Sequence, residues 1–474
     1  MPKVKEDILK KTLFIPLEII DREIDGGCLL ALEAVKRGWK VIIGSQREIT
    51  KSIESNEIGV YFLKSITPGQ INLQKRILNS GSLIFCQDAE GLLQRPGKSR
   101  LRFSEESLSC TQKVFFWGNQ QKADFINTFG NKYESICLVT GSPRADHWEL
   151  ISRLNDKHKI CSENKFILIA TSFGNENHAL GQAGQYNLSA DEAGLKYGAN
   201  TVENFNKYFQ DMYKLGFFLI PNYQKLIKDL SQKFPDENFI LRPHPSENPD
   251  VWKDIISPLP NVVLRNDGSI IDWLNKSKVL IHNGSTCAFQ ANILKIPVIS
   301  LIPELPDSIK DYDIEYARKA SFVYSNIPEL LKDLDDFLKG KINLLPVNFD
   351  YLDKLIFSRN TVDSSKRIME VIDEVYKNNK KVKRVRNLRN FDYKINQFKR
   401  NILLLLSFLP FWSKFAPQKY KHFSLKTYLY YKNRKQPKQS LIEFKDRINY
   451  LKKISSFKKD LQVKPYKKNV FEIF

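Results

Sequence analysis

Two carboxylates stand beside a glycine directly after a short apolar run. Residues 82–86 (Ser-Leu-Ile-Phe-Cys) predict a buried strand, and Gln87-Asp88-Ala89-Glu90-Gly91 follows it. A carboxylate fixed at the end of a strand can act as a general base or as a nucleophile. Asp88 could equally cap a helix, with Glu90 in its first turn. Both interpretations stay open at this point.

A histidine between two prolines follows a second apolar run. Arg242-Pro243-His244-Pro245 comes after Phe239-Ile-Leu, and alternate residues of an extended strand face the same side. Arg242 and His244 can therefore meet one ligand, and an imidazole with a guanidinium suits a phosphate or a carboxylate. The prolines stiffen the turn. The alternative is a turn histidine that bonds only to the backbone.

A glycine turn with two hydroxyls follows a third apolar run, residues 278–282. The turn consists of Asn283, Gly284, Ser285 and Thr286, and an apolar helix is predicted over 287–294. Backbone N–H groups and the helix dipole at such a start favour a phosphate. Ser285 or Thr286 could instead only cap the helix. His282, on the strand itself, is expected to be a core residue.

A charged segment follows the first predicted strand, residues 13–19. It contains Glu18, Asp21, Arg22, Glu23 and Asp25. We expect a loop at the end of a strand here. Acceptor recognition and a solvated turn are both consistent with these residues.

Apolar runs alternate with segments of helical period through residues 12–330. This pattern predicts an α/β protein with parallel sheets covered on both faces. The pattern restarts near residue 166, so we expect two Rossmann-like domains, 1–155 and 156–376, that face a cleft. A mainly helical basic tail, 377–474, is expected to follow them. Ligands of such sheets bind beyond the carboxyl ends of the strands, where the polar segments above are placed.

The tail carries the whole charge imbalance of the chain. The 474 residues have a net charge of +21, and residues 377–474 hold 27 Lys or Arg against five acids, a net of +22. Within it, residues 402–412 form a broken apolar stretch flanked by cations, too short for the ~20 residues of a membrane span. We expect contact with an anionic membrane surface rather than with nucleic acid. Plain packing of the tail on the body is the alternative.

The composition narrows the class of protein. A hydrophobic fraction of 42% supports buried cores, and the six cysteines form no C-x-x-C pair, which argues against a disulfide framework or a zinc knuckle. The first twenty residues lack the apolar core of a secretory signal. We expect a cytoplasmic protein, held peripherally at the inner face of the membrane by its tail.

The order of the three polar segments resembles a known family. Bacterial sialyltransferases of the GT-B fold show an Asp/Glu-Asp/Glu-Gly motif, a His-Pro motif and a serine-rich motif in that order, and related Kdo transferases also use CMP-activated ulosonic acids. The matching segments here are Asp88-Ala89-Glu90-Gly91, His244-Pro245 and Ser285-Thr286, with an inserted alanine in the first. The chain also resembles surface carbohydrate biosynthesis proteins in residues 22–26, 29–38, 140–146, 170–174 and 242–248.

The resemblance implies a metal-independent glycosyltransferase that moves a sugar, a Kdo-like ulosonic acid, from CMP to a glycan or lipid-linked glycan acceptor. No cofactor beyond the nucleotide sugar is implied. Asp88, Glu90 and His244 would be catalytic, with a carboxylate as base in an inverting reaction or as nucleophile in a retaining one. Donor binding would fall to Arg242, His244, Pro245, Asn283, Gly284, Ser285 and Thr286. Other substrate contacts would come from Glu18, Arg22, Asp25, Ser142 and Arg144.

Three other classes share parts of this pattern. A CDP-polyol phosphotransferase of the cell-wall type also uses a Pro-His-Pro turn and a basic surface. A UDP-sugar 2-epimerase has the same two-domain fold but is not expected to carry a membrane tail. A scaffold of a polysaccharide assembly complex would bind no cytidine nucleotide.

Overall fold

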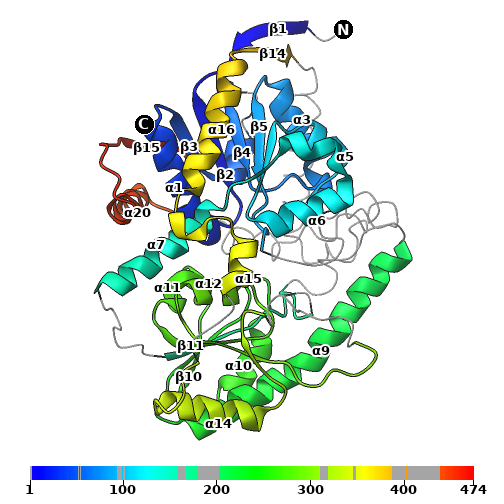
Figure 1. Ribbon diagram of the computed structural model, residues 1–474, viewed down its shortest axis with the longest axis vertical. Coiled ribbons are helices and arrows are strands. Elements are labelled where there is room, and N and C mark those ends of the chain that lie inside the picture. The colour runs from blue at the N-terminus through cyan, green and yellow to red at the C-terminus, as the bar shows by residue number, and fades with distance from the viewer. Residues whose placement is uncertain are drawn as a thin grey trace. The chain divides into compact units, whose positions relative to one another are not determined.

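The computed structural model describes most of the chain, as two compact units (Figure 1). The described residues are 3–51, 53, 55–92, 99, 102–158, 166–174, 176–179, 202–309, 319–344, 349–386, 402 and 438–474. Unit 1 takes the described residues up to Leu150 and from Asp353 onward, and unit 2 takes those between Ile151 and Leu352.

Unit 1 is built on an eight-stranded sheet in the order β15-β16-β3-β2-β4-β5-β6-β7. Its parallel strands are β2 (Thr12–Leu17), β3 (Lys40–Ser45), β4 (Val60–Leu63), β5 (Leu83–Gln87), β6 (Lys113–Phe116) and β7 (Cys137–Val139). Its helices are α1 (Ile20–Lys36), α2 (Gln46–Thr50), α3 (Ile71–Asn79), α5 (Glu105–Ser109), α6 (Asn119–Phe129), the first half of α7 (Pro143–His158), α16 (Ser364–Asn378) and α20 (Leu441–Ile454).

Unit 2 is built on a six-stranded parallel sheet in the order β10-β9-β8-β11-β12-β13. The strands are β8 (Phe166–Ala170), β9 (Phe239–Arg242), β10 (Val262–Leu264), β11 (Ser277–His282), β12 (Val298–Leu301) and β13 (Phe322–Tyr324). The helices are α9 (Val202–Lys233), α10 (Asp250–Ile256), α11 (Ile270–Leu274), α12 (Cys287–Ile293) and α14 (Ile327–Leu338), and the residues of α15 (Phe349–Leu355) are divided between the two units. This strand order is that of the doubly wound Rossmann sheet, whose switch point lies between β8 and β11.

The predicted α/β class with two Rossmann-like parallel sheets is confirmed. The central strands are continuous apolar runs because both faces of each sheet are covered, and every residue of β2, β4, β5 and β8 is buried. Helices contribute one apolar side each to these cores, as α1 does with Leu30 and Ala34.

The domain boundaries differ from those predicted. We expected residues 353–376 in the second domain, but α16 packs on α1 of unit 1. Trp39 fixes this contact, since its indole N–H donates to Asp373 Oδ1 at 2.8 Å and its ring meets Tyr376 edge-on. Nothing in the order of the predicted elements marks a helix that returns to the first sheet.

The end of the basic tail, residues 438–474, is an integral part of unit 1, and it contains two strands as well as a helix. β15 (Val463–Lys467) and β16 (Val470–Ile473) form a hairpin, and β16 pairs antiparallel with β3. α20 packs on α1 through buried residues that include Phe444, whose ring stacks on Phe471 at 4.1 Å. Separately, β1 (Lys3–Ile8) pairs antiparallel with β14 (Lys381–Arg386). The predicted lipid-contacting stretch 402–412 lies outside the described residues, except Ile402.

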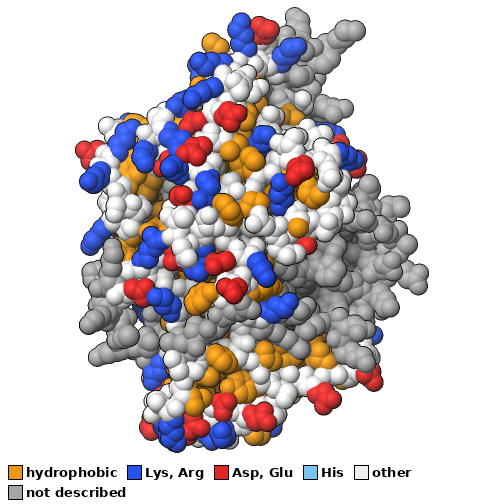
Figure 2. Space-filling view, in the orientation of Figure 1, with side chains coloured by type: hydrophobic (Ala, Val, Ile, Leu, Met, Phe, Trp, Pro, Cys, Tyr) orange, Lys and Arg blue, Asp and Glu red, His pale blue; other side chains and the backbone are white. Residues whose placement is uncertain are grey.

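Within the described residues, no helix is both long enough and apolar enough to cross a bilayer. Figure 2 shows basic side chains on much of the visible face, with acidic ones interspersed among them.

Candidate functional site

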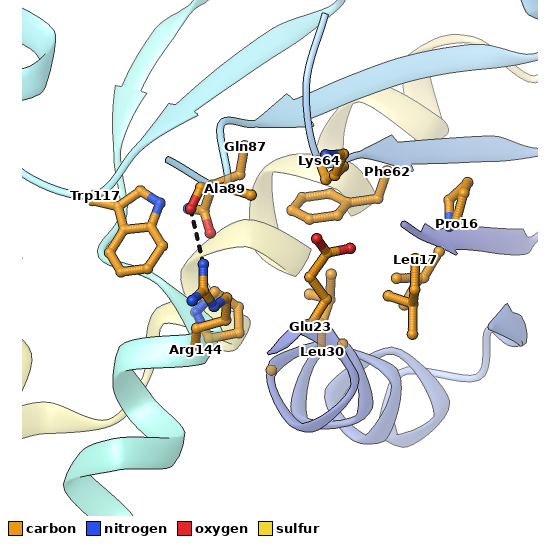
Figure 3. A pocket seen from close by; sticks show the side chains of 14 residues that line it. Pro16, Leu17, Glu23, Leu30, Phe62, Lys64, Gln87, Ala89, Trp117 and Arg144 are labelled. Atoms are coloured by element: carbon orange, nitrogen blue, oxygen red, sulfur yellow. Dashed lines mark hydrogen bonds between the residues drawn. The ribbon is translucent and has the colours of Figure 1, made fainter. Parts of the chain in front are cut away.

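The sheet of unit 1 opens at its switch point. β2 and β4 pair only through Leu13 with Val60 and Phe14 with Tyr61, although both strands continue toward their carboxyl ends. A cavity of about 60 Å³ lies at this opening (Figure 3). It is lined by Ile15, Pro16, Leu17, Glu23, Gly26, Gly27, Leu30, Phe62, Lys64, Gln87, Ala89, Trp117, Pro143 and Arg144. Crevices at this position of doubly wound sheets are where ligands bind.

Helix α1 brings charged residues to this opening. The predicted charged loop is wrong from Ile20 onward, because Arg22, Glu23 and Asp25 belong to the first two turns of α1. Gly26 lets α1 approach α7 closely, since a Cβ there would lie 2.7 Å from Arg144 Cγ and 2.9 Å from Arg144 N. Arg22 lies one turn before Gly26 on the same helix face, and this places it beside Arg144.

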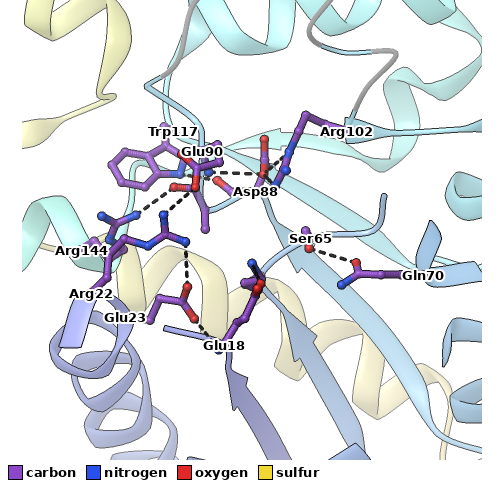
Figure 4. Close-up of polar contacts among 12 residues, drawn as sticks. Glu18, Arg22, Glu23, Ser65, Gln70, Asp88, Glu90, Arg102, Trp117 and Arg144 are labelled. Atoms are coloured by element: carbon purple, nitrogen blue, oxygen red, sulfur yellow. Dashed lines mark hydrogen bonds and ion pairs between the residues drawn. The ribbon is translucent and has the colours of Figure 1, made fainter. Parts of the chain in front are cut away.

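Arg22 is held by two carboxylates (Figure 4). Its Nη1 donates to Glu90 Oε1 at 2.6 Å and its Nη2 to Glu23 Oε1 at 3.0 Å. Burial disfavours the charged guanidinium, but Glu90 and Glu23 outweigh this effect and raise the pKa of Arg22. The other Glu23 oxygen accepts the backbone N–H of Glu18 at 2.8 Å, which fixes Glu23 in turn. The side chain of Glu18 pairs with Lys64.

Arg144 lies against two tryptophans and has fewer ionic contacts. Its guanidinium lies 5.4 Å from the ring centre of Trp117 and 5.5 Å from that of Trp148, and Nη1 donates to the carbonyl of Ala89 at 2.8 Å. Burial, and then the neighbouring positive charge of Arg22, lower the pKa of Arg144 to about 10. It remains charged at neutral pH. The Nε of Arg144 is buried without a hydrogen-bond partner among the described residues.

The two predicted carboxylates have different surroundings. Asp88 is buried and pairs with Arg102, whose Nε donates to Asp88 Oδ1 at 2.9 Å. Glu90 is 33% exposed and bonds to Arg22. Asp88 also holds the turn, because its carbonyl accepts the indole N–H of Trp117 at 2.8 Å and its Oδ1 accepts the Glu90 N–H at 3.3 Å. Glu90 is therefore the carboxylate of this pair that a ligand can reach.

Gly91, the glycine of this motif, is required by packing. A Cβ at this position would lie 2.1 Å from Cδ1 of the Trp117 ring. The glycine thus allows the tryptophan that contacts Arg144 to lie under the carboxylate turn.

Two of the residues predicted to contact the substrate instead hold neighbouring helices in place. Ser142 is fully buried, and its hydroxyl accepts the Arg144 N–H at 3.3 Å, so it holds the start of α7 and presents no group to a ligand. Asp25 is 12% exposed and pairs with Arg447 of α20. His147 Nδ1 lies 3.8 Å from the other Asp25 oxygen. These residues join α1, α7 and α20 behind the site.

In unit 2, the His-Pro turn follows β9 and is held from below by a buried carboxylate. Glu247 accepts the backbone N–H of His244 at 2.9 Å, that of Phe173 at 3.0 Å and the Thr171 hydroxyl at 2.9 Å. Burial raises the pKa of Glu247, although these bonds oppose the shift. Thr171 and Phe173 follow β8, so Glu247 joins the carboxyl ends of two neighbouring strands.

The imidazole of His244 is exposed at this turn, as is Pro245. Its Nδ1 accepts the Ser246 N–H at 3.2 Å and lies 2.6 Å from Ser246 Oγ. Because Nδ1 accepts an N–H, the neutral ring carries its proton on Nε2. Gly174 permits this packing, since a Cβ there would lie 2.1 Å from Ser246 Oγ.

The glycine turn follows β11 on the other side of β8. Asn283 Oδ1 accepts the Ser172 N–H at 2.6 Å, which ties this turn to the end of β8 across the switch point. The predicted amide cradle is wrong for two of its groups, because the N–H groups of Gly284 and Ser285 both donate to His282 Nδ1 at 3.0 Å. The half-buried hydroxyls of Ser285 and Thr286 remain at the turn, although Ser285 Oγ also accepts the Cys287 N–H at 3.3 Å.

His282 is a core residue, as expected. It is fully buried, and burial lowers its pKa to about 3. Its Nε2 lies 2.7 Å from Ser321 Oγ. Since Nδ1 accepts two N–H groups, the neutral ring donates from Nε2 and both nitrogens are satisfied.

Arg242 is oriented by backbone oxygens and an aromatic ring. Its Nη1 donates to the Asp267 carbonyl and its Nη2 to the Gly268 carbonyl, both at 2.6 Å, and the guanidinium lies 5.9 Å from the Trp273 ring centre. Its charge also acts on the Cys287 thiol, where it opposes the rise in pKa caused by burial. It therefore lies near both turns at this edge of the sheet.

Several residues of these sites were not predicted. Lys64, Trp117 and Trp148 complete the unit 1 site, and Thr171 and Glu247 complete the unit 2 turn. Glu247 carried a signal, since the chain contains a His-Pro-Ser-Glu turn after an apolar run. Nothing in the sequence indicated the two tryptophans, because only the fold brings them beneath Arg144. Among the described residues, no group of three or more His, Cys, Asp or Glu side chains is placed to hold a metal ion.

No protein-family model and no curated protein matches the chain. Similar solved structures include the UDP-GlcNAc 2-epimerase of Neisseria meningitidis bound to UDP-GlcNAc, with 14% identity and a TM-score of 0.43 over 77% of this chain and 99% of that one. The UDP-GlcNAc 2-epimerase of Methanocaldococcus jannaschii shows 11% identity and a TM-score of 0.45 over 77% and 99%. The wall teichoic acid polymerase TagF shows 14% identity and a TM-score of 0.40 over 78% and 90%.

Proposed function

We propose that this protein is a glycosyltransferase of surface polysaccharide synthesis that takes a sugar from a nucleotide-activated donor, in particular a Kdo-like ulosonic acid from CMP. The observation that carries the proposal is the polar cluster at the switch point of unit 2. There the His244 turn, the end of β8 and the 283–286 turn are tied together by Glu247 and Asn283. A nucleotide is the kind of ligand that such a switch point binds.

In this proposal unit 2 binds the donor phosphate. His244 offers Nε2–H to a phosphate oxygen, and the hydroxyls of Ser285 and Thr286 offer further donors. The amides of Gly284 and Ser285 take no part, because His282 holds them. Arg242 supplies positive charge at the same edge of the sheet, which favours the leaving phosphate as its charge develops.

Unit 1 supplies the carboxylate that activates the acceptor hydroxyl. Glu90 is the candidate, because Asp88 is buried and bound to Arg102. A general base must reach the proton that it removes, and the one-third exposure of Glu90 allows this. No step in this scheme requires a metal ion.

Donor binding tests the proposal directly. We expect CMP to bind in isothermal titration and His244→Ala to weaken it by about 10–100-fold, the size of one lost charge-assisted hydrogen bond. Arg265→Ala is a matched control, since it removes a side chain next to the loop that holds Arg242. Failure of CMP, CDP, UDP and GDP to bind would contradict the proposal and favour a scaffold role. Product analysis with CMP-sugar and CDP-polyol donors separates a glycosyltransferase from a polyol phosphotransferase.

We also propose that residues 377–474 hold the enzyme at an anionic membrane surface, where a lipid-linked acceptor would be found. The support is the net charge of +22 and the apolar stretch 402–412. A truncation after Tyr376 is unsuitable as a test, because it removes α20 and β16 from unit 1. Vesicle co-sedimentation of a variant with Lys399, Arg400 and Lys414 changed to Gln is suitable. Equal binding to anionic and neutral vesicles by the unaltered chain would contradict the proposal.

A further inference from the structure

The site in unit 1 brings two guanidinium groups close together: Arg144 lines the cavity, and Arg22 lies beside Arg144 (Figure 4). Arg22 comes from the start of α1 and Arg144 from the start of α7, and the contact of Gly26 with Arg144 fixes the two helices against each other. Two like charges in a partly buried position repel each other, as the effect of Arg22 on Arg144 shows. The positive charge of such a pair favours a negative group beside it.

Glu90 provides that negative group from within the chain. Its Oε1 accepts from Arg22 Nη1 at 2.6 Å, and the adjacent Ala89 carbonyl accepts from Arg144 at 2.8 Å. One short turn therefore occupies both guanidinium groups (Figure 4). Glu23 also binds Arg22, but its second oxygen is fixed by the Glu18 N–H and it is 5% exposed. Glu90 is 33% exposed, so it is the partner that a ligand can replace.

We propose that Arg22 and Arg144 form a binding site for an oxyanion of the acceptor, a phosphate or a carboxylate, and that Glu90 occupies this site until the anion displaces it. This rests on the proposed function, and it adds that the acceptor is itself anionic. A guanidinium N–H group donates a charge-assisted hydrogen bond to a carboxylate or phosphate, and displacement of Glu90 frees Arg22 Nη1 for such a bond.

Displacement would also change the chemistry of Glu90. In its pair with Arg22, the Glu90 carboxylate is occupied by a guanidinium and is not available to an acceptor hydroxyl. Once an anion takes over Arg22, Glu90 is released beside the acceptor that has just bound. Binding of the correct acceptor therefore activates the base.

The test is a titration with acceptor-like anions in the absence of any donor. The probes are glycerol 1-phosphate and glucuronate, which separate a phosphate from a carboxylate as the group recognised. We expect at least one to bind to the full-length protein, and Glu90→Gln to bind it about tenfold more tightly because the competing carboxylate is neutral. Glu106→Gln, which changes an exposed carboxylate paired with Lys75 in the same unit, is expected to have no effect.

Arg144→Met is expected to weaken binding at least tenfold, and Arg144→Lys to restore part of it. Thermal unfolding of both variants shows whether unit 1 stays folded, and the comparison of Glu90→Gln with the unaltered protein does not depend on them. His244→Ala leaves this binding unchanged if the anion binds in unit 1, so the result is separate from the donor site. Equal affinity of the unaltered protein and Glu90→Gln, or no binding of either probe, would overturn the proposal.

Discussion

Replacing Phe444 by alanine tests whether the end of the basic tail is part of unit 1. Phe444 lies on α20, is 1% exposed, and stacks on Phe471 of β16 with an angle of 12° between the rings. It belongs to the same core as Leu30 and Ile43 of α1 and β3. A purely membrane-bound tail would place no such residue in the core.

The size of the effect follows from this burial. Truncation of a fully buried phenylalanine to alanine costs about 3–5 kcal/mol of unfolding free energy, which includes the cavity left behind. The stacked ring of Phe471 loses its partner, and an aromatic pair contributes about 0.5–1.5 kcal/mol beyond its area. We therefore expect a loss near the upper end of the first range.

Urea unfolding followed by tryptophan fluorescence measures this loss, because Trp39, Trp117 and Trp148 lie in unit 1. Ile442→Ala is the matched control, since Ile442 lies on the same helix and is 72% exposed. It is expected to change stability by less than about 0.5 kcal/mol. A loss below about 1 kcal/mol for Phe444→Ala would refute the docking of α20 on unit 1.

Three other predictions concern stability and the unit 1 site. The contribution of His282 to the stability of unit 2 is expected to fall below pH 6.5 by about 1.4 kcal/mol per pH unit, because burial lowers the pKa of His282 from its unfolded value to about 3. Urea unfolding at pH 7 and pH 5 measures this loss, which the raised pKa of Glu247 in the same unit opposes. In unit 1, Asp146 gives a pH dependence of stability with the opposite sign, because burial raises its pKa to about 6. The stability that this group contributes falls as the pH rises from about 4 to 6, and Asp146→Asn should remove this dependence in the same unfolding experiment. Gly26→Ala is expected to lower the free energy of unfolding by about 1–3 kcal/mol and to weaken anion binding, because its Cβ would meet the Arg144 backbone. Gly27→Ala should cost less, since its Cβ would meet only side-chain atoms, the nearest at 3.1 Å.

The alternation of apolar runs and helical periods was enough to predict both parallel sheets. Strands such as β5 and β11 are built around short apolar runs, and the polar groups that follow them were correctly placed beyond strand ends. Local sequence carries this information, because burial on both faces of a sheet dictates the composition of each strand.

Contacts between distant segments could not be predicted in this way. The pairing of β16 with β3 joins residues more than 400 positions apart, and a basic, aromatic segment has the same composition whether it covers a membrane or a core. The amides of Gly284 and Ser285 illustrate a second limit. Their sequence fits a phosphate cradle, but the His282 ring accepts both N–H groups, and only the folded turn shows this.

The different roles of Asp88 and Glu90 could also not be predicted, because they depend on contacts that form only in the folded chain. The two acids are equivalent in sequence, and the fold separates them by burying one against Arg102 and leaving the other beside Arg22. The positions of Arg22 and Arg102 along the chain do not show which of the two acids each arginine binds.

The central claim, that Glu90 activates an acceptor for transfer from a cytidine-activated sugar, is tested most directly by the turnover of Glu90→Gln. Product formation from a CMP-activated ulosonic acid and CMP affinity are measured on the same preparation. We predict that kcat falls at least about 100-fold while the Kd for CMP stays within about twofold, because an amide keeps the shape but cannot accept the proton. Near-normal turnover by Glu90→Gln would contradict this claim. Transfer by Glu90→Gln from any other donor at the rate of the unaltered protein would also contradict it.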